Sequence, residues 1–195
     1  MIHFDIDKAI QATAYLLKRK PNRCDNYTRV LKLLYLADRA SLKLRGVPIC
    51  GDTSFAMSRG PVFSTTLDLI KGRDPRVDKW DRFVEKCGYD ICLKADPGNL
   101  HLSPAEIDIL EGVARRFQGF DETALIHWCH KNVPEYQKNW KARKEGAKRA
   151  RIPFEDVLSA IGRSEDQSRI IEEMNEALAF NRLFSHHMPA SGTQG

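Results

Sequence analysis

The sequence predicts a mainly α-helical domain that carries a small antiparallel β-hairpin element. Apolar residues recur at helical spacing in several stretches, Gly and Pro separate these stretches at short intervals, and only short segments alternate between apolar and polar residues. A chain of 195 residues with 42% hydrophobic and 29% charged residues can bury one substantial core. We therefore expect a compact single domain and not a disordered chain.

Two helices are expected at the start of the chain. Apolar residues at helical spacing predict the first over residues 5–19, with Asp5 or Asp7 as its N-cap. The second is expected over residues 25–44, and Asp25 is suited to cap it. Because its middle, VLKLLYLADRA, is apolar on nearly every side, we expect this helix to be buried in the centre of the domain.

Short elements follow the second helix. The Gly-Asp pair at 51–52 signals a turn, and residues 53–57 have the composition of a short strand. The Gly-Pro pair at 60–61 interrupts the chain again. Because proline suits the first turn of a helix, a helix is predicted over residues 61–71.

A hairpin and a further helix are expected next. Residues 89–102 alternate between apolar and polar side chains, and the Asp-Pro-Gly-Asn sequence at 96–99 is typical of a turn. Ser103, with Pro104 after it and Glu106 three residues on, forms a capping box that begins a helix.

The remaining elements are predicted to be helical. Asp121 is suited to cap one helix, and Pro134 begins or bends the next. A short helix is expected over residues 156–161 and a last one over residues 164–183. The predicted organisation is a domain over residues 1–162, a C-terminal helix packed on it over residues 163–184, and a loose tail over residues 185–195.

The net charge of +5 is concentrated in one segment. Residues 138–151, KNWKARKEGAKRAR, contain seven basic residues and one acidic residue, so the rest of the chain carries a net charge of −1. This pattern predicts a local anionic partner or a solvated helix, and not a protein that coats nucleic acid. Trp140 lies among these cations and could stack on a base of a single strand. We favour a helix that Trp140 anchors to the core.

The cysteines and the N-terminus indicate a cytoplasmic protein. The five cysteines are odd in number and form no CxxC motif, so reduced and mostly buried thiols are expected. No apolar run approaches the ~18 residues of a membrane helix. The first ten residues, MIHFDIDKAI, have acids where a secretory signal peptide needs a basic segment.

Acid–base chemistry is one interpretation of two carboxylates near the middle of the chain. Asp38 lies within the second helix and Asp52 in the following turn, and a catalytic pair would need both in one site that excludes water. The alternative is that Asp38 pairs with Arg39 or Arg45, or caps the turn at Gly51. We favour the alternative.

Metal and nucleophile motifs are weak in this sequence. His127, Cys129 and His130 would need a second close pair of ligands to bind zinc, and Cys87 with Cys92 matches that spacing poorly. We instead expect His130 to be buried and hydrogen-bonded to the backbone. GxSxG, P-loop and GxGxxG motifs are absent from the sequence. We expect no catalytic activity, no cofactor and no metal ion.

The stretch from Lys32 to Gly72 resembles the Panacea domain of the SocA-like antitoxin family. Ordered short motifs carry the resemblance. Parts of the chain downstream also look like the family, and the resemblance covers about residues 5–160. Two positions depart from the family pattern. The family often has Tyr where this chain has Leu67, and relatives often carry a Trp closer to His130, where this chain has Tyr136 and then Trp140. The motifs are KLLYLADR at 32–39, GxPI at 46–49, GD at 51–52, AMxxGPV at 56–62, Ser64, and DLIKG at 68–72.

This resemblance implies an antitoxin of a type II toxin–antitoxin system. Such a protein would neutralise a toxin encoded by an adjacent gene through direct protein–protein binding, without an enzymatic activity. Some phage and prophage proteins resemble the family too, which implies a role in phage defence. Two alternatives remain, namely a nucleic-acid-binding regulator that acts through residues 138–151, and an adaptor that delivers its partner to a protease.

The predicted site is a platform at the end of the second helix and the turn that follows. We expect that some of its polar groups, Asp38, Arg39, Asp52 and Arg59, bind each other and lock this platform, while exposed neighbours meet the toxin. The candidate platform or partner-binding residues are Asp38, Arg39, Gly51, Asp52, Met57, Arg59, Gly60, Pro61, Ser64, His130 and Trp140.

Overall fold

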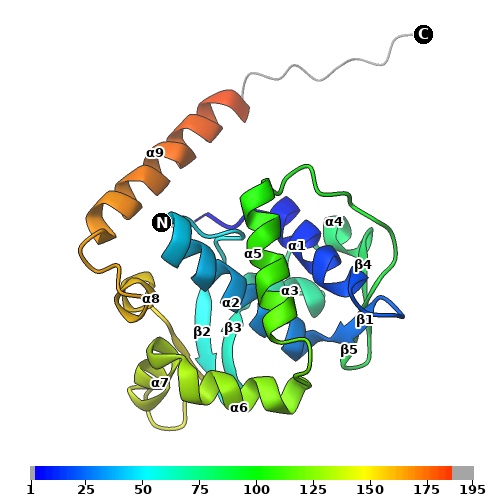
Figure 1. The fold of residues 1–195 in the computed structure, drawn as a ribbon, viewed down its shortest axis with the longest axis horizontal. Helices are drawn as coiled ribbons and strands as arrows, with labels where there is room; N and C mark the ends of the chain where they lie inside the picture. The colour runs from blue at the N-terminus through cyan, green and yellow to red at the C-terminus, as the bar shows by residue number, and fades with distance from the viewer. Residues whose placement is uncertain (1–2, 186–195) are drawn as a thin grey trace.

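The computed structural model describes residues 3–185, which form nine helices and two three-stranded antiparallel sheets. The predicted fold class, mainly α with a minor β part, is confirmed. In Figure 1, α2 and α5 cross at the centre, α1, α3, α4 and one sheet lie on one side, and α6 and α7 lie at the end of the other sheet. Helix α9 projects from this body toward the C-terminus.

Helix α2 (Tyr27–Arg45) is the buried helix that the sequence predicts. Both flanks of its apolar stretch are covered, and Leu33, Leu34 and Leu36 are all buried. Its N-cap is Asn26 and not the predicted Asp25, because residues 24–26 form a strand and the Asn26 side chain accepts hydrogen bonds from the two amides that follow Tyr27. The helix ends at Gly46, whose φ of +79° favours glycine.

Local capping signals correctly predict three further helices around α2. Asp5 caps α1, and Asp121 caps α6 by accepting a hydrogen bond from Ala124 N. Ser103 and Glu106 form the predicted capping box at the start of α5. Each of these caps satisfies amides that the first turn of a helix leaves without a partner. The bounds are α1 (Ile6–Lys18), α5 (Pro104–Arg116) and α6 (Glu122–Asn132).

The first sheet has the strand order β1-β5-β4, and the predicted hairpin with its turn at 96–99 is wrong. The hairpin instead turns at Gly88, whose φ is +65°, and pairs two strands upstream of the predicted turn. Residues 96–102 contain no strand because the Gln11 side chain holds this loop against α1, donating to Pro97 O and accepting from His101 N. The strands are β1 (Cys24–Asn26), β4 (Val84–Cys87) and β5 (Asp90–Leu93).

A disulfide joins Cys24 to Cys92 across the pairing of β1 with β5. The expectation of reduced thiols is therefore wrong for these two residues, which the register places directly opposite each other. The sequence gives no sign of this pairing because 68 positions separate the two cysteines. Cys50 and Cys129 are buried free thiols, and Cys87 is an exposed one.

The second sheet has the order β3-β2-β6 and corrects two predictions. Pro61 lies in β3 and not in the first turn of a helix, so helix α3 begins only at Ser64. Proline is tolerated there because Pro61 faces Ala56 in a pair that shares no hydrogen bond, so its missing N–H faces away from β2. The elements are β2 (Ser54–Met57), β3 (Gly60–Phe63) and α3 (Ser64–Ile70).

One interpretation of the basic segment 138–151 predicted a single solvated helix, and the structure contradicts it. Helix α7 (Pro134–Lys141) starts at Pro134 and ends within the segment, and a loop through Gly146, whose φ is +74°, leads to β6 (Arg149–Arg151). Strand β6 pairs antiparallel with β2. Because residues 149–151 gain backbone hydrogen-bond partners in β2, they form a strand and not a continuation of the helix.

The last part of the described chain consists of two helices that follow β6. Arg163 Nη1 lies 3.2 Å from the carbonyl oxygens of Leu42 and Lys43, and Ile170 is fully buried beside Gly46. The predicted apolar side chains Leu178 and Phe184 and the predicted tail after Ser185 lie outside the described part of the molecule. The remaining helices are α4 (Val77–Asp81), α8 (Phe154–Ala160) and α9 (Gln167–Ser185).

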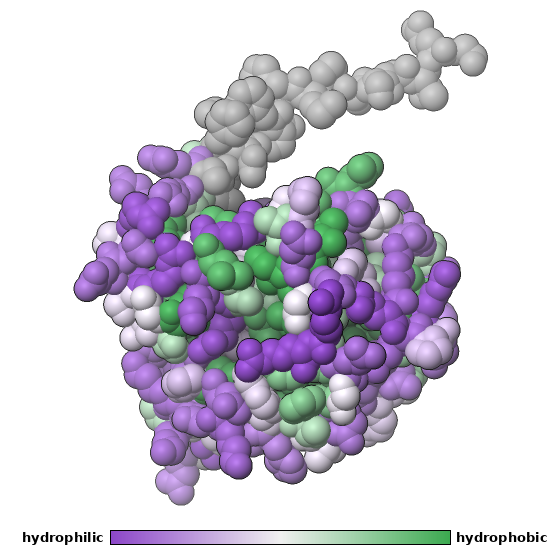
Figure 2. Space-filling model, in the orientation of Figure 1, coloured by the Kyte–Doolittle hydropathy of each residue, from purple (hydrophilic) through white to green (hydrophobic). Residues whose placement is uncertain are grey.

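The surface is mixed in polarity. Figure 2 shows hydrophobic residues toward the middle of one face, over α2 and α5, with hydrophilic residues around them. Among residues 3–185, no helix is both long enough and apolar enough to span a bilayer.

Reduction of the Cys24–Cys92 disulfide should lower the free energy of unfolding. The chain-entropy model gives about 4 kcal/mol for a loop of this length. Urea unfolding with and without dithiothreitol measures the difference. A Cys24→Ser, Cys92→Ser double variant should not respond to the reductant, whereas Cys87→Ser should keep the full response. Equal stability of the wild-type chain in both conditions would contradict the pairing.

Candidate functional site

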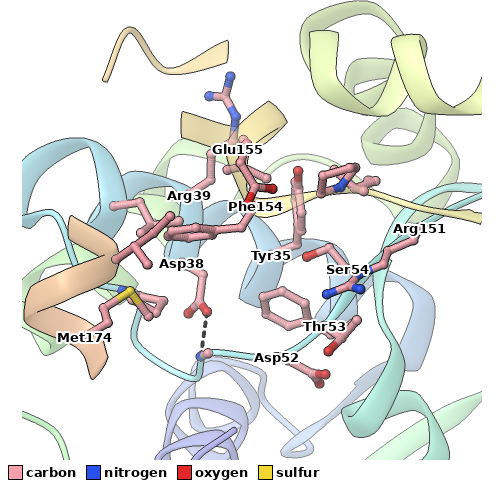
Figure 3. Close-up of a pocket in the computed structure, with 18 of the residues that line it drawn as sticks. Tyr35, Asp38, Arg39, Asp52, Thr53, Ser54, Arg151, Phe154, Glu155 and Met174 are labelled. Carbon is pink, nitrogen blue, oxygen red and sulfur yellow. Dashed lines mark hydrogen bonds between the residues drawn. The ribbon is translucent and has the colours of Figure 1, made fainter. Parts of the chain in front are cut away.

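A cavity of about 320 Å³ lies between α2, the loop before β2, the β6–α8 segment and α9. Figure 3 shows Met174 of α9 and Arg151 of β6 on opposite sides of the cavity, with Asp38 and Phe154 between them. Most of its walls are apolar, and several charged side chains lie at its floor and mouth. The side chains that define its character are Asp38, Arg39, Leu42, Asp52, Phe63, Arg151, Phe154, Glu155, Val157, Ile171 and Met174.

Asp38 forms the floor of the cavity and holds the loop that follows α2. Its carboxylate accepts hydrogen bonds from the amides of Ile49, Cys50 and Gly51 at 3.1, 2.9 and 3.0 Å. Figure 3 draws the bond to Gly51, whose φ is +65°. Burial raises the pKa of Asp38 to about 7, although the three amides act in the opposite direction. Of the alternatives for this residue, the cap on the turn at Gly51 is the one observed.

Asp52 holds the start of α3 in the same way. Its carboxylate accepts from the amides of Thr65 and Thr66 at 2.9 and 2.7 Å and from the Thr66 hydroxyl at 2.7 Å. Burial raises the pKa of Asp52, and the hydrogen bonds oppose this shift. Asp52 thus acts as a cap for α3, whose own N-cap residue, Phe63, supplies no side-chain bond.

A buried carboxylate on α7 ties that helix to α2. Glu135 Oε1 accepts from Tyr35 Oη at 2.7 Å and from Arg39 Nε at 2.8 Å. The side chain of Glu135 is completely buried. Sequence reasoning missed Tyr35 and Glu135, although Lys32, Tyr35 and Arg39 at spacings of three and four residues predict one polar side on an otherwise apolar helix.

A buried lysine lies at the turn of the β2–β3 hairpin. Lys32 is 2% exposed, and its Nζ is 3.1 Å from where a Cβ on Gly60 would stand. Burial lowers the pKa of Lys32 to about 8, and burial raises the pKa of the neighbouring Cys129 thiol to about 11. Arg59, at the tip of the hairpin, pairs with Glu122 at 2.6 Å. Gly60, with φ of +103°, therefore permits both the turn and the close approach of the lysine.

A column of planar groups connects α6 to the basic segment. His130 and Tyr136 stack with ring centroids 5.1 Å apart, and Tyr136 and Trp140 stack at 6.4 Å. The guanidinium of Arg143 lies over the Trp140 ring, 3.8 Å from its centroid. Trp140 is half-buried, as expected for an anchor to the core.

His130 is half-buried rather than buried, and its partners are a side chain and the backbone. Its Nε2 lies 3.1 Å from Tyr136 Oη, and the backbone of Ser58 also bonds to the ring. Burial lowers the pKa of His130, with Lys32 acting in the same direction.

The structure divides the predicted site residues into two groups at opposite ends of the β2–β3 hairpin. The expectation that some of Asp38, Arg39, Asp52 and Arg59 bind each other is wrong, because each has a partner elsewhere. Met57, Arg59, Gly60, Pro61, His130 and Trp140 belong to the turn end. At the open end, Asp38, Arg39, Gly51 and Asp52 line the cavity, and Ser64 N donates to Thr53 O.

Arg151 is one of the cavity residues that sequence reasoning missed. It is exposed, lies at the mouth of the cavity, and makes no ion pair with a described residue. The only feature of the sequence that pointed to Arg151 is its position in the basic segment 138–151. Among residues 3–185, no three His, Cys, Asp or Glu side chains are placed to hold a metal ion.

A model of the family described as antitoxin SocA-like, Panacea domain, matches residues 30–141, which is more than half of the chain. The match runs from α2 to the end of α7 and so includes Asp38, Asp52, the β2–β3 hairpin and Glu135. It ends before β6, α8 and α9. No curated protein and no solved structure matches the chain.

Asp38→Ala should destabilise the fold by about 3 kcal/mol or more, because three buried amides each lose an acceptor at a cost of about 1–3 kcal/mol. Chemical denaturation at pH 7 measures the change. Asp108→Ala, which alters an exposed carboxylate on α5, serves as the matched control and should change stability by less than about 0.5 kcal/mol. If the free energy of unfolding of the Asp38 variant falls by less than about 1 kcal/mol, the loop keeps its conformation without the Asp38 hydrogen bonds.

Lys32→Met should be more stable than the wild type at neutral pH, and the difference should become smaller at high pH. The folded-state pKa of Lys32 is about 8 against an ordinary 10.5, which corresponds to about 3 kcal/mol. Below pH 8 both states are protonated and the cost of burying the charge is complete. Between pH 8 and 10.5 the folded state loses its proton first, so wild-type stability rises relative to the variant.

Unfolding curves of both proteins at pH 7 and pH 10 measure this narrowing. Lys86→Met, at an exposed position of β4, should give a stability difference that does not change with pH. A constant difference for Lys32→Met as well would show that burial does not shift this lysine.

Proposed function

The chain belongs to the SocA-like antitoxin family with a Panacea domain, and from this we propose that it neutralises a cognate protein toxin by binding to it directly. The observation that carries the proposal is the family match over residues 30–141. In this proposal the toxin is encoded beside the antitoxin, as in a type II system. Neutralisation requires no chemical step from this chain, only a folded surface that covers part of the toxin.

The geometry of the matched segment supports a binding protein and not an enzyme. Asp38 and Asp52, the two carboxylates considered for acid–base chemistry, are occupied by backbone amides. Arg39 is occupied by Glu135. These bonds fix the loop and two helices relative to α2, and such preorganisation lowers the entropy cost of binding a partner. A stable complex of this kind buries about 800 Å² on each partner.

The contacts of the basic segment support a protein partner over a single-stranded nucleic acid. Binding of a single strand relies on free aromatic faces on which bases stack. Tyr136 stacks with Trp140, the guanidinium of Arg143 lies over the Trp140 ring, and the guanidinium of Arg149 lies 4.7 Å from the ring centre of Phe55. The cations of the segment can therefore attract an anionic surface, but its aromatic rings are already in contact with their own arginines.

Expression of the neighbouring gene alone should arrest growth, and co-expression with this chain should restore it. The two proteins should copurify. Direct neutralisation further requires that the purified chain inhibit the purified toxin with no protease or nucleic acid present. Rescue in cells without inhibition in this assay would favour an adaptor or a regulator. A harmless neighbour would remove the proposal for that gene pair.

A further inference from the structure

Strand β6 leaves one edge of its sheet open. Ile152 N donates to Ser54 O at 2.9 Å, and the register places Ala150 opposite Ala56. Because hydrogen-bonded pairs alternate with non-bonded pairs in an antiparallel ladder, Arg149 and Arg151 direct their N–H and C=O groups away from β2. Within residues 3–185, no other hydrogen bond engages the amides of these two arginines. The edge therefore offers two donors and two acceptors at strand spacing.

The other side of β2 is already used. Ser64 N donates to Thr53 O at 2.9 Å, and the same alternation pairs Phe55 with Val62 and Met57 with Gly60. Because β2 is bonded to β3 on one side and to β6 on the other, a strand added on the β6 side of the sheet must pair with β6.

Most of the charges beside this edge have no ion-pair partner among residues 3–185. Of the seven basic residues in segment 138–151, only Lys138 makes an ion pair with a described residue, Asp156, at 2.7 Å. The segment carries a single acid, Glu145. By contrast, Arg163, which precedes α9, and Arg169, in its first turn, both pair with Asp166. The surplus of positive charge therefore favours a partner that brings negative charge to this edge. The cations without an ion pair are Lys141, Arg143, Lys144, Lys148, Arg149 and Arg151.

The cavity begins where β6 ends. Arg151 lines its mouth and Phe154 its wall, and Leu42 and Met174 supply further apolar surface. In Figure 3, Arg151 reaches into the view from β6 beside Ser54. A residue placed opposite Arg151 on an added strand would have its side chain on the same face of the sheet as Arg151. The next residue along that strand would have its side chain on the opposite face, where Ser54, Phe63 and Ile152 line the cavity.

We propose that β6 accepts an extended acidic segment of the partner toxin as a fourth strand of this sheet. The segment's backbone bonds to the open edge at Arg149 and Arg151, its carboxylates pair with these two guanidinium groups, and one apolar side chain enters the cavity. Polypeptide is favoured as the ligand because the N–H and C=O groups of the edge match the backbone of another strand and not a sugar–phosphate chain. This inference rests on the proposed function.

The ordinary role of such charges is to prevent edge-to-edge aggregation, and a short edge strand rich in arginine is suited to that role. The two roles differ in what the toxin does to the edge. A strand that only prevents aggregation stays open in the complex, whereas a docking strand has its outward amides covered.

Amide hydrogen exchange of the full chain, free and bound to the purified toxin, tests the proposal without a mutation. The amides of Arg149 and Arg151 should exchange rapidly in the free chain and at least about tenfold more slowly in the complex. Phe55 and Met57, which bond to β3, are internal controls that should be protected in both states. A complex that inhibits the toxin while both arginine amides exchange unchanged overturns this inference and leaves the proposed function intact.

Two variants give an independent measurement. Arg149→Ala with Arg151→Ala should weaken toxin binding at least about tenfold, and the loss should shrink in high salt. Arg82→Ala, an exposed arginine after α4, is the matched control and should leave the Kd unchanged. Unfolding curves of each variant check that the fold is kept.

Arg151→Pro removes one outward donor without removing a bond to β2 and should weaken binding further than Arg151→Ala. The inference is overturned if the variants at Arg149 and Arg151 bind the toxin with the same Kd as the wild type. Protection of the same amides by an anionic oligonucleotide, and not by the toxin, also overturns it. A chain that binds no toxin removes both this inference and the proposed function.

Discussion

The burial of α2 is the constraint on which the rest of the structure depends. Each polar side chain that the helix carries into the interior needs a partner, and the partners come from distant parts of the chain. Asp38 holds the loop before β2, Arg39 meets Glu135 of α7, and Arg29 donates to the carbonyls of Phe117 and Phe120. These bonds decide where the loop, α7 and the end of α5 lie. Lys32 is the exception, since burial leaves its charge destabilised.

Signals that act within a few residues could be predicted from the sequence, and pairings between distant segments could not. The capping box at Ser103 and the cap at Asp121 are local and were found. Residues 24–26 resemble the first turn of a helix until β5 pairs with them, and β5 lies more than 60 positions away. Pro61 is typical of a helix start, yet the sheet tolerates it because its pair with Ala56 needs no amide.

The same limit explains which site residues were found. The turn at 51–52 and the position of Asp38 on α2 indicate a fixed loop, and this loop is the floor of the cavity. Glu135 could not be assigned from the sequence because its partner Tyr35 is 100 positions away. Arg151 became a candidate only when β6 was seen to pair with β2 and to lie at the mouth of the cavity.

The cavity is formed by two parts of the chain, one inside the matched family segment and one beyond it. Its floor belongs to the matched family segment, where side chains such as Asp38 hold the fold together. Its other wall, made by β6, α8 and α9, lies beyond residue 141. Strand β6 joins the sheet through backbone bonds that any non-proline residue at position 150 can make, so the side chains at 149 and 151 can change without loss of the pairing. A scaffold of this design can keep its fold while its edge is altered to suit a different partner.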